Sequence, residues 1–435
     1  MDTKDPIPPA PSPTSPTSQT SPTQPRRRPS RFFTYAILTG AVLTLLGVMG
    51  MQRHGKARAA VKPVAPVAVA PVPRAPEAPD PIVATPPAPA TRPRVELVFA
   101  LDTTSSMSGL IEGAKQKIWS IASFVAQGQP TPDLRVGLIA YRDIGDEYVT
   151  KVYDLDQDLD RVYRRLRNFR AEGGGDTPEH VARALDESVR KMSWSQAQEV
   201  VKVIYLVGDA APHTDYQDGY DYARSARLAA KKGIALHTIE CGNDRETEVV
   251  WRKIAALGGG QFMAIHQNGG MTAEHSRWDD ELARLHDKLG RTAIGYGAGA
   301  PAAAAAVREA EAAPAPVKAA RAAFMASNGR AIGGKGDLVD AIAKGEAKLA
   351  DVQAELPADL RAMDKDAQAV VIANKQKERR AINDRIVELS KLRKKELDAR
   401  EEAAARGGAA EGFDVAAKKA LKRSVEANAL SGLKL

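Results

Sequence analysis

Cysteine is nearly absent from this sequence: Cys241 is the only one in 435 residues. A lone cysteine cannot form a disulfide within the chain, so a small secreted domain held together by disulfides is excluded. Cys241 lies in the segment "ALHTIECG", which is typical of a buried strand. We therefore expect a packed thiol there and not a reactive one.

The chain also lacks a surface of one charge sign. Its net charge of +8 arises mostly from Lys318 onward, where 24 basic residues are interspersed with 18 acidic ones. Such mixing is typical of solvated helices, whereas a nucleic-acid interface needs basic residues gathered on one face. We expect no nucleic-acid partner.

Two segments have too little apolar mass to form a core. Residues 1–31 are rich in Pro, Ser and Thr, which predicts a disordered tail. Residues 52–93 are rich in Pro and Ala, which favours an extended, semi-rigid spacer.

Between these segments lies a long apolar run, "FFTYAILTGAVLTLLGVMGM" at residues 32–51, which contains no charged residue. At a helical rise of about 1.5 Å per residue it spans roughly 30 Å, the hydrocarbon thickness of a bilayer. We expect an uncleaved, single-pass transmembrane helix; a signal peptide cleaved near Ala57-Arg58-Ala59 is the alternative. The arginines just before the run favour a cytoplasmic N-terminus, with the bulk of the chain outside the cytoplasm.

Short apolar segments alternate with helical patterns between residues 94 and 297. The apolar segments are "VELVFALD", "LRVGLIAYRD", "VVKVIYLVGD", "IALHTIECG" and "GQFMAIHQ". This alternation predicts an α/β fold, a doubly wound and mostly parallel sheet covered on both faces. The segment "YVTKVYDL" follows its neighbour after a short turn and is expected as an antiparallel edge strand. About 200 residues suffice for one core, so we expect this range to fold as a unit.

The rest of the chain has an Ala/Pro-rich stretch and then helical patterns. We expect a linker at residues 298–317 and a helical region at residues 318–435. One apolar stripe in that region consists of Ile382, Ile386, Leu389, Leu392 and Leu397. It predicts a helical hairpin that buries the stripe against itself or the sheet domain; a coiled-coil partner surface is the alternative.

Oxygen-bearing side chains gather after two predicted strands and in a glycine-rich turn. They are Asp102, Thr104 and Ser106 in "LDTTSSM", Thr177 in "EGGGDTPEH" and Asp209 in "YLVGDAAPH". Ligands of open parallel sheets bind at the carboxyl ends of the strands. Carboxylate and hydroxyl oxygens suit Mg²⁺, Mn²⁺ or Ca²⁺, although each of these residues taken alone could cap a helix instead.

This ordered set resembles the metal-ion-dependent adhesion site of von Willebrand factor type A (vWA) domains, and the run over residues 94–297 is similar to bacterial membrane-anchored members. The resemblance implies that Asp102, Thr104, Ser106, Thr177 and Asp209 surround a divalent cation, Mg²⁺ first, with Mn²⁺ or Ca²⁺ as alternatives. It further implies that an Asp or Glu carboxylate of a protein ligand completes the coordination sphere. The function implied is a membrane-anchored adhesion or assembly module of the cell envelope, with no catalytic residue. Ser105 stands where close relatives often have Gly.

Three other interpretations stay open. A metal-dependent hydrolase or phosphotransferase could use the same site, but Thr104 cannot act as the second acid of such a phosphotransferase, and Ser106 lacks the Gly-x-Ser-x-Gly turn of a hydrolase that would use His213 as its base. A structural envelope scaffold is the second. The acidic turn "YRDIGDEY" could hold another cation, although a hairpin tip is the commoner explanation.

Overall fold

The computed structural model describes residues 92–175, 179–267, 275–407 and 412–435. They belong to one compact unit. The predicted tail at 1–31, the transmembrane helix at 32–51 and all but the last two residues of the spacer lie outside the described residues. Within the described ranges, no helix is both long and apolar enough to cross a membrane.

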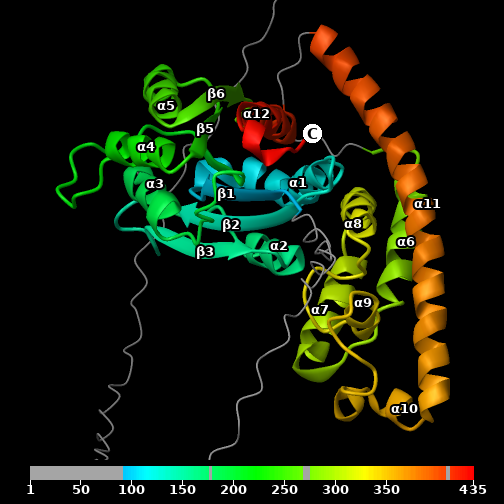
Figure 1. The fold of residues 1–435 in the computed structure, drawn as a ribbon. Helices are drawn as coiled ribbons and strands as arrows, with labels where there is room; N and C mark the ends of the chain where they lie inside the picture. Colours follow the sequence, from blue (N-terminus) through cyan, green and yellow to red (C-terminus); the bar gives the residue numbers. More distant parts are fainter. Residues whose placement is uncertain (1–91, 176–178, 268–274, 408–411) are drawn as a thin grey trace, which may run out of the picture. The chain divides into compact units, whose positions relative to one another are not determined.

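A six-stranded sheet forms the centre of this unit, in the order β3-β2-β1-β4-β5-β6 (Figure 1). The strands are β1 (Arg94–Asp102), β2 (Asp133–Tyr141), β3 (Thr150–Asp156), β4 (Val201–Gly208), β5 (Ile234–Cys241) and β6 (Gly259–Ile265). Neighbouring strands are parallel except β2 and β3, which pair antiparallel at one edge. The predicted α/β fold with an antiparallel edge strand is therefore confirmed. Cys241 at the end of β5 is buried, as expected.

Helices cover both faces of the sheet, because side chains of a strand point alternately to either side. Leu97, Phe99 and Leu101 of β1 pack into one core, while Val98 and Ala100 pack into the other. The first face is covered by α1 (Ser108–Ala126), α2 (Leu159–Arg167) and α12 (Phe413–Ala427), and the second by α3 (Val181–Arg190), α4 (Tyr222–Lys231) and α5 (Arg245–Leu257). Helix α2 was not anticipated from the sequence.

The last helix of the chain, α12, belongs to the core of the sheet. The ring centroids of Phe413 and Phe99 lie 6.1 Å apart, and the chain end returns to the loop after α1, where Lys434 pairs with Gln129. The boundary predicted at residue 297 did not anticipate that a helix beyond it packs on the sheet. The apolar face of a helix is visible in a sequence, but the partner that buries it is not.

The remaining helices form a second group beside α1. They are α6 (Asp279–Gly290), α7 (Ala300–Glu311), α8 (Ala315–Ser327), α9 (Leu338–Ala343), α10 (Ala358–Arg361) and the long α11 (Lys365–Arg406), with short 3-10 turns at Ser105–Met107, Gly297–Gly299, Gln353–Glu355 and Ala429–Ser431. Helix α8 contacts α1, α6 and α11. The predicted linker at 298–317 is mostly helical, because alanine favours helix and each of α7 and α8 has a proline in its first turn, where proline is tolerated.

The apolar stripe of α11 is buried along part of its length. Ile382, Ile386 and Leu389 join the main core, where α11 contacts α6 and α8. Leu392 is 40% exposed. The stripe is therefore covered by neighbouring helices of the same chain, and a coiled coil with a partner is not needed to bury its first half.

A buried ion pair ties α2 to α8. Arg321 donates from Nε to Asp160 Oδ1 at 2.8 Å and from the guanidinium tip to Oδ2 at 2.7 Å. The backbone N–H of Gly333 also donates to Asp160 Oδ2, at 2.8 Å. A Cβ on the next residue, Gly334, would lie only 2.5 Å from Asp158 Oδ2. The glycines of "GRAIGGKGD" thus let the backbone approach these carboxylates.

Candidate metal-binding site

The predicted site lies where β1 and β4 end. The two strands are parallel neighbours, so Asp102 at the end of β1 and Asp209 just after β4 reach the same edge of the sheet. Gly208 makes this approach possible: a Cβ there would collide with the hydroxyl of Tyr141 and lie 3.1 Å from Asp102 Oδ2.

Three of the predicted residues are joined by hydrogen bonds in the loop after β1. Thr104 donates to Asp102 Oδ1 from its backbone N–H at 2.8 Å and from its hydroxyl at 2.7 Å. The hydroxyl oxygens of Thr104 and Ser106 lie 3.2 Å apart. Short polar side chains favour this kind of local turn. Asp102, Thr104 and Ser106 are therefore held together by their own loop.

The second carboxylate oxygen of Asp102 has no protein partner. Asp102 is fully buried, and its Oδ2 accepts no hydrogen bond. A buried polar atom without a partner is costly and rare. Burial, together with the nearby Asp209 carboxylate, raises the pKa of Asp102 to about 7. A divalent cation would bond this oxygen and offset the repulsion, so the residues present fit such an ion.

The fourth predicted residue, Asp209, directly follows β4. Asp209 is half-buried, and its Oδ2 accepts a hydrogen bond from Gln267, which no sequence signal singled out. Thr177 lies outside the described residues. The described Gly174 approaches the first loop, because a Cβ there would lie 3.1 Å from Thr104 Cβ.

Glu179 is a further carboxylate at this edge and was not among the predicted site residues. It is 2% exposed, and its Oε2 has no hydrogen-bond partner. Burial and the neighbouring carboxylates, Asp102 first, raise the pKa of Glu179 to about 9. The sequence feature that could have identified Glu179 is its position directly after Thr-Pro in the same glycine-rich segment as Thr177.

The acidic turn "YRDIGDEY" is hydrogen-bonded to the glycine-rich segment beside the site. Asp146 accepts hydrogen bonds from the backbone N–H of Gly174, at 3.2 and 3.3 Å, and from that of Asp143, at 3.3 Å. Glu147 points to solvent, with 66% of its side chain exposed. Across the described ranges, no three His, Cys, Asp or Glu side chains are grouped so that they could hold a metal ion. The predicted set differs from such a group, because hydroxyls supply three of its five donors.

The imidazole of His213 contacts two acidic side chains. Its Nδ1 is 2.9 Å from Asp215 Oδ1, and its Nε2 is 3.5 Å from Asp143 Oδ2. Its ring stacks on Tyr216 at 4.3 Å between centroids, and Tyr216 donates to Asp143 at 2.6 Å. His213 is thus part of the wall around the acidic turn.

Residues 96–272 match the family model of the von Willebrand factor type A domain, and the chain contains such a domain over this range. Conserved hypothetical protein BatB from Bacteroides thetaiotaomicron is similar in structure, with 19% identity over 40% of this chain and 90% of that one and a TM-score of 0.31. An aerotolerance-related membrane protein from Bacteroides fragilis shows 18% identity over 40% and 92% of the two chains, with a TM-score of 0.29. A search of curated proteins finds no match.

Proposed function

We propose that Asp102, Thr104, Ser106, Thr177 and Asp209 hold a divalent cation, Mg²⁺ first, with Mn²⁺ or Ca²⁺ as alternatives. The observation that carries the proposal is the fully buried Oδ2 of Asp102, which has no partner and lies near a second carboxylate. The contacts of Thr104 also support the proposal, because its two hydrogen bonds to Oδ1 fix the orientation of the Asp102 carboxylate.

The proposed role of the cation is to bind an Asp or Glu carboxylate of a partner protein. A cation held partly by neutral hydroxyls keeps positive charge, which attracts an external carboxylate. The loop residues contribute by positioning: Thr104 and Ser106 stay beside Asp102 through their mutual hydrogen bond, which leaves no need for a large rearrangement. The vWA domain supports an interaction module of this kind.

Binding fits the site better than turnover. Nucleophilic catalysis needs a base within hydrogen-bond reach of the nucleophile. In the described part of the chain, the Ser106 hydroxyl has Thr104 as its hydrogen-bond partner, and His213 pairs with Asp143 and Asp215. Two alternatives have their own tests. A metal-dependent hydrolase or phosphotransferase would show cation-dependent activity, and a structural envelope scaffold would bind its partner in EDTA.

We also propose that residues 32–51 anchor the chain in a bacterial membrane as a single pass, with the bulk of the chain outside the cytoplasm. The support is the uncharged run of 20 residues, whose length matches a bilayer. The Pro/Ala-rich spacer would then hold the vWA domain away from the membrane surface.

The decisive experiment is a metal titration of the full chain in which the melting temperature is measured at each metal concentration. A cation that binds only the folded state stabilises it by RT ln(1 + [L]/Kd), about 2.7 kcal/mol at a hundredfold excess over Kd. Asp102→Asn should remove this shift, while Asp384→Asn, an exposed acid on α11, should leave it intact. Indifference of the wild type to millimolar Mg²⁺, Mn²⁺ and Ca²⁺ would refute the metal site.

Partner binding is tested separately. Immobilised full chain should retain a protein in Mg²⁺ and release it in EDTA, and a synthetic acidic peptide should compete. Retention that survives EDTA would favour the scaffold interpretation.

A further inference from the structure

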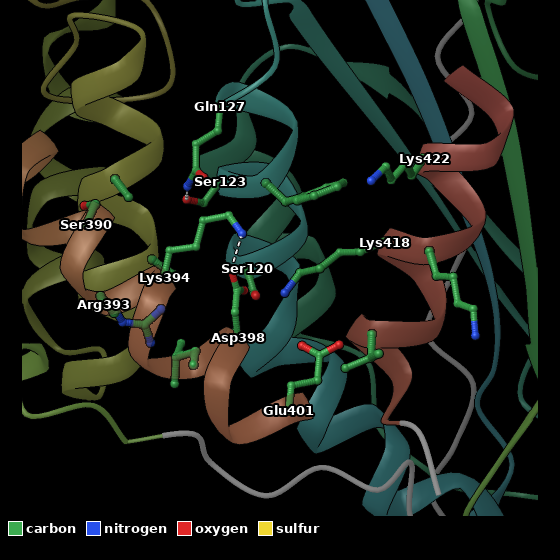
Figure 2. A pocket seen from close by; sticks show the side chains of 16 residues that line it. Ser120, Ser123, Gln127, Ser390, Arg393, Lys394, Asp398, Glu401, Lys418 and Lys422 are labelled. Carbon is green, nitrogen blue, oxygen red and sulfur yellow. Dashed lines mark hydrogen bonds and ion pairs between the residues drawn. The ribbon is translucent and has the colours of Figure 1, made fainter. Parts of the chain in front are cut away.

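A cavity of about 430 Å³ lies between α1, α8, α11 and α12, away from the candidate metal site (Figure 2). Its lining on α1 starts at Ser120, twelve residues beyond the first residue of that helix, or about 18 Å along the axis. The metal site lies at the other end of α1. Ligand cavities in proteins commonly measure about 300–1,000 Å³, so the space suits a small molecule.

Part of the wall is apolar. Phe124 from α1, Leu397 from α11 and Val415 from α12 line it, together with Ala320 and Ala323 from α8. Ala320 and Ala323 are 4% and 7% exposed, and their methyl groups leave room that larger side chains would fill. An apolar ligand segment would gain burial against these groups.

The rest of the wall is strongly basic. The cationic side chains are Arg393, Lys394, Lys418, Lys419 and Lys422, against two acidic ones, Asp398 and Glu401. Figure 2 shows Arg393 and Lys394 on α11 across the cavity from Lys418 and Lys422 on α12. The excess of positive charge favours an anionic ligand group.

Ion pairs hold several of these cations in place. Lys394 lies 2.6 Å from Asp398, and Lys418 lies 3.0 Å from Asp414. Lys422 is exposed, and no carboxylate of the described residues forms an ion pair with it. It is therefore the cation best placed to take a charged ligand.

We propose that this cavity binds a long-chain fatty acid, with its carboxylate at Lys422 and its acyl chain against Phe124, Leu397 and Val415. A single apolar chain with one negative end matches a cavity that combines an apolar wall and a basic rim. The proposal is independent of the metal site, because the two share no lining residue.

The test uses the full chain in membranes, with palmitic acid that carries a photoreactive diazirine in its acyl chain as the probe. Peptide mapping distinguishes labelling in the cavity from labelling elsewhere in the chain. We expect crosslinks on the cavity-lining segments of α1, α8, α11 and α12. Unlabelled palmitate should displace the probe at a concentration about tenfold lower than 1-hexadecanol, which has the same chain but no charge.

Variants separate charge from fold. Lys422→Gln should raise the palmitate concentration needed for half-displacement about tenfold. Lys395→Gln, an exposed lysine of α11 outside the cavity, is the matched control and should change nothing. Val415→Trp, at a half-buried position of α12, should fill the cavity and abolish labelling at an unchanged melting temperature.

Three results would overturn the proposal. They are labelling that avoids the cavity, equal displacement by palmitate and hexadecanol, and an equal palmitate concentration for half-displacement in wild type and Lys422→Gln. Displacement of the probe by an acidic peptide at lower concentration than by palmitate would likewise overturn it and assign the cavity to a peptide.

Discussion

The hydroxyl of Tyr205 on β4 donates a hydrogen bond to the carbonyl of Ala417 on α12, at 2.7 Å and across 212 positions of the chain. The same tyrosine ring stacks on Phe99 of β1, with 5.0 Å between centroids. The central strands of the vWA domain therefore depend on a helix that follows all the other helices in the sequence.

Truncating the aromatic anchor of α12 should destabilise the whole domain. Phe413 is 2% exposed and packs on the sheet, so Phe413→Ala should cost about 3–5 kcal/mol of unfolding free energy. Denaturant unfolding followed by circular dichroism measures the change. Val370→Ala, at a valine that is 58% exposed, is the control and should stay within about 0.5 kcal/mol. Equal effects of the two would show that α12 is dispensable.

The metal-free protein should lose stability as pH rises. Asp102 and Glu179 have ordinary pKa values of 3.8 and 4.5, raised in the fold to about 7 and about 9. The folded state then binds more protons than the unfolded chain between those values, so the unfolding free energy falls as pH increases through that window.

The measurement is the melting temperature between about pH 5 and 9 in EDTA and in Mg²⁺. Mg²⁺ should remove much of the decline, because it compensates the carboxylate charges. Glu179→Gln should flatten the profile above about pH 7, whereas Glu147→Gln, at an exposed acid, should not. A profile that rises with pH in EDTA would contradict this account.

Asp102→Ala and His213→Ala should differ in their effect on partner binding. Asp102→Ala should abolish the cation-dependent association, since the proposed ion loses its buried carboxylate. His213→Ala should change it little, because His213 contacts Asp143 and Asp215 and not the hydroxyls of the loop. A cation-dependent phosphatase or esterase activity that disappears in His213→Ala would support the enzyme instead.

Breaking the buried ion pair between α2 and α8 should be costly. Asp160 and Arg321 are 6% and 3% exposed, and Asp160→Asn would leave a buried guanidinium without its counter-charge, at a cost of about 3–5 kcal/mol. Thermal unfolding measures the loss. Glu378→Gln removes an exposed pair with Lys375 and should cost less than about 1 kcal/mol. Similar losses of unfolding free energy in both variants would show that the buried pair stabilises the fold no more than an exposed one.

The membrane anchor makes a prediction of its own. The full chain should sediment with membranes and keep its N-terminus, and deletion of residues 32–51 should release it to the soluble fraction. Fractionation and the mass of the N-terminal peptide are the measurements. A soluble product that begins at Ala60 would identify a cleaved signal peptide.

Much of the architecture followed from local pattern. The strands from Arg94 to Ile265 are short apolar runs, and an apolar run between helical patterns leaves a parallel sheet as the simplest arrangement. The position of the candidate site followed for the same reason, because Asp102 and Asp209 each come directly after such a run.

Other features were decided by contacts between distant parts of the chain. The alanines of 298–317 suggested a linker, yet Ala303, Ala306 and Ala310 of α7 are buried where that helix meets its neighbours. Glu179 was not among the predicted site residues, and only the fold brings its carboxylate near Asp102. Residue types and spacing thus determined the strands, the sheet and the edge where polar groups meet. Tertiary structure decided that α12 closes the core and that the Oε2 of Glu179 is buried without a partner, because burial depends on which surfaces meet and not on local period.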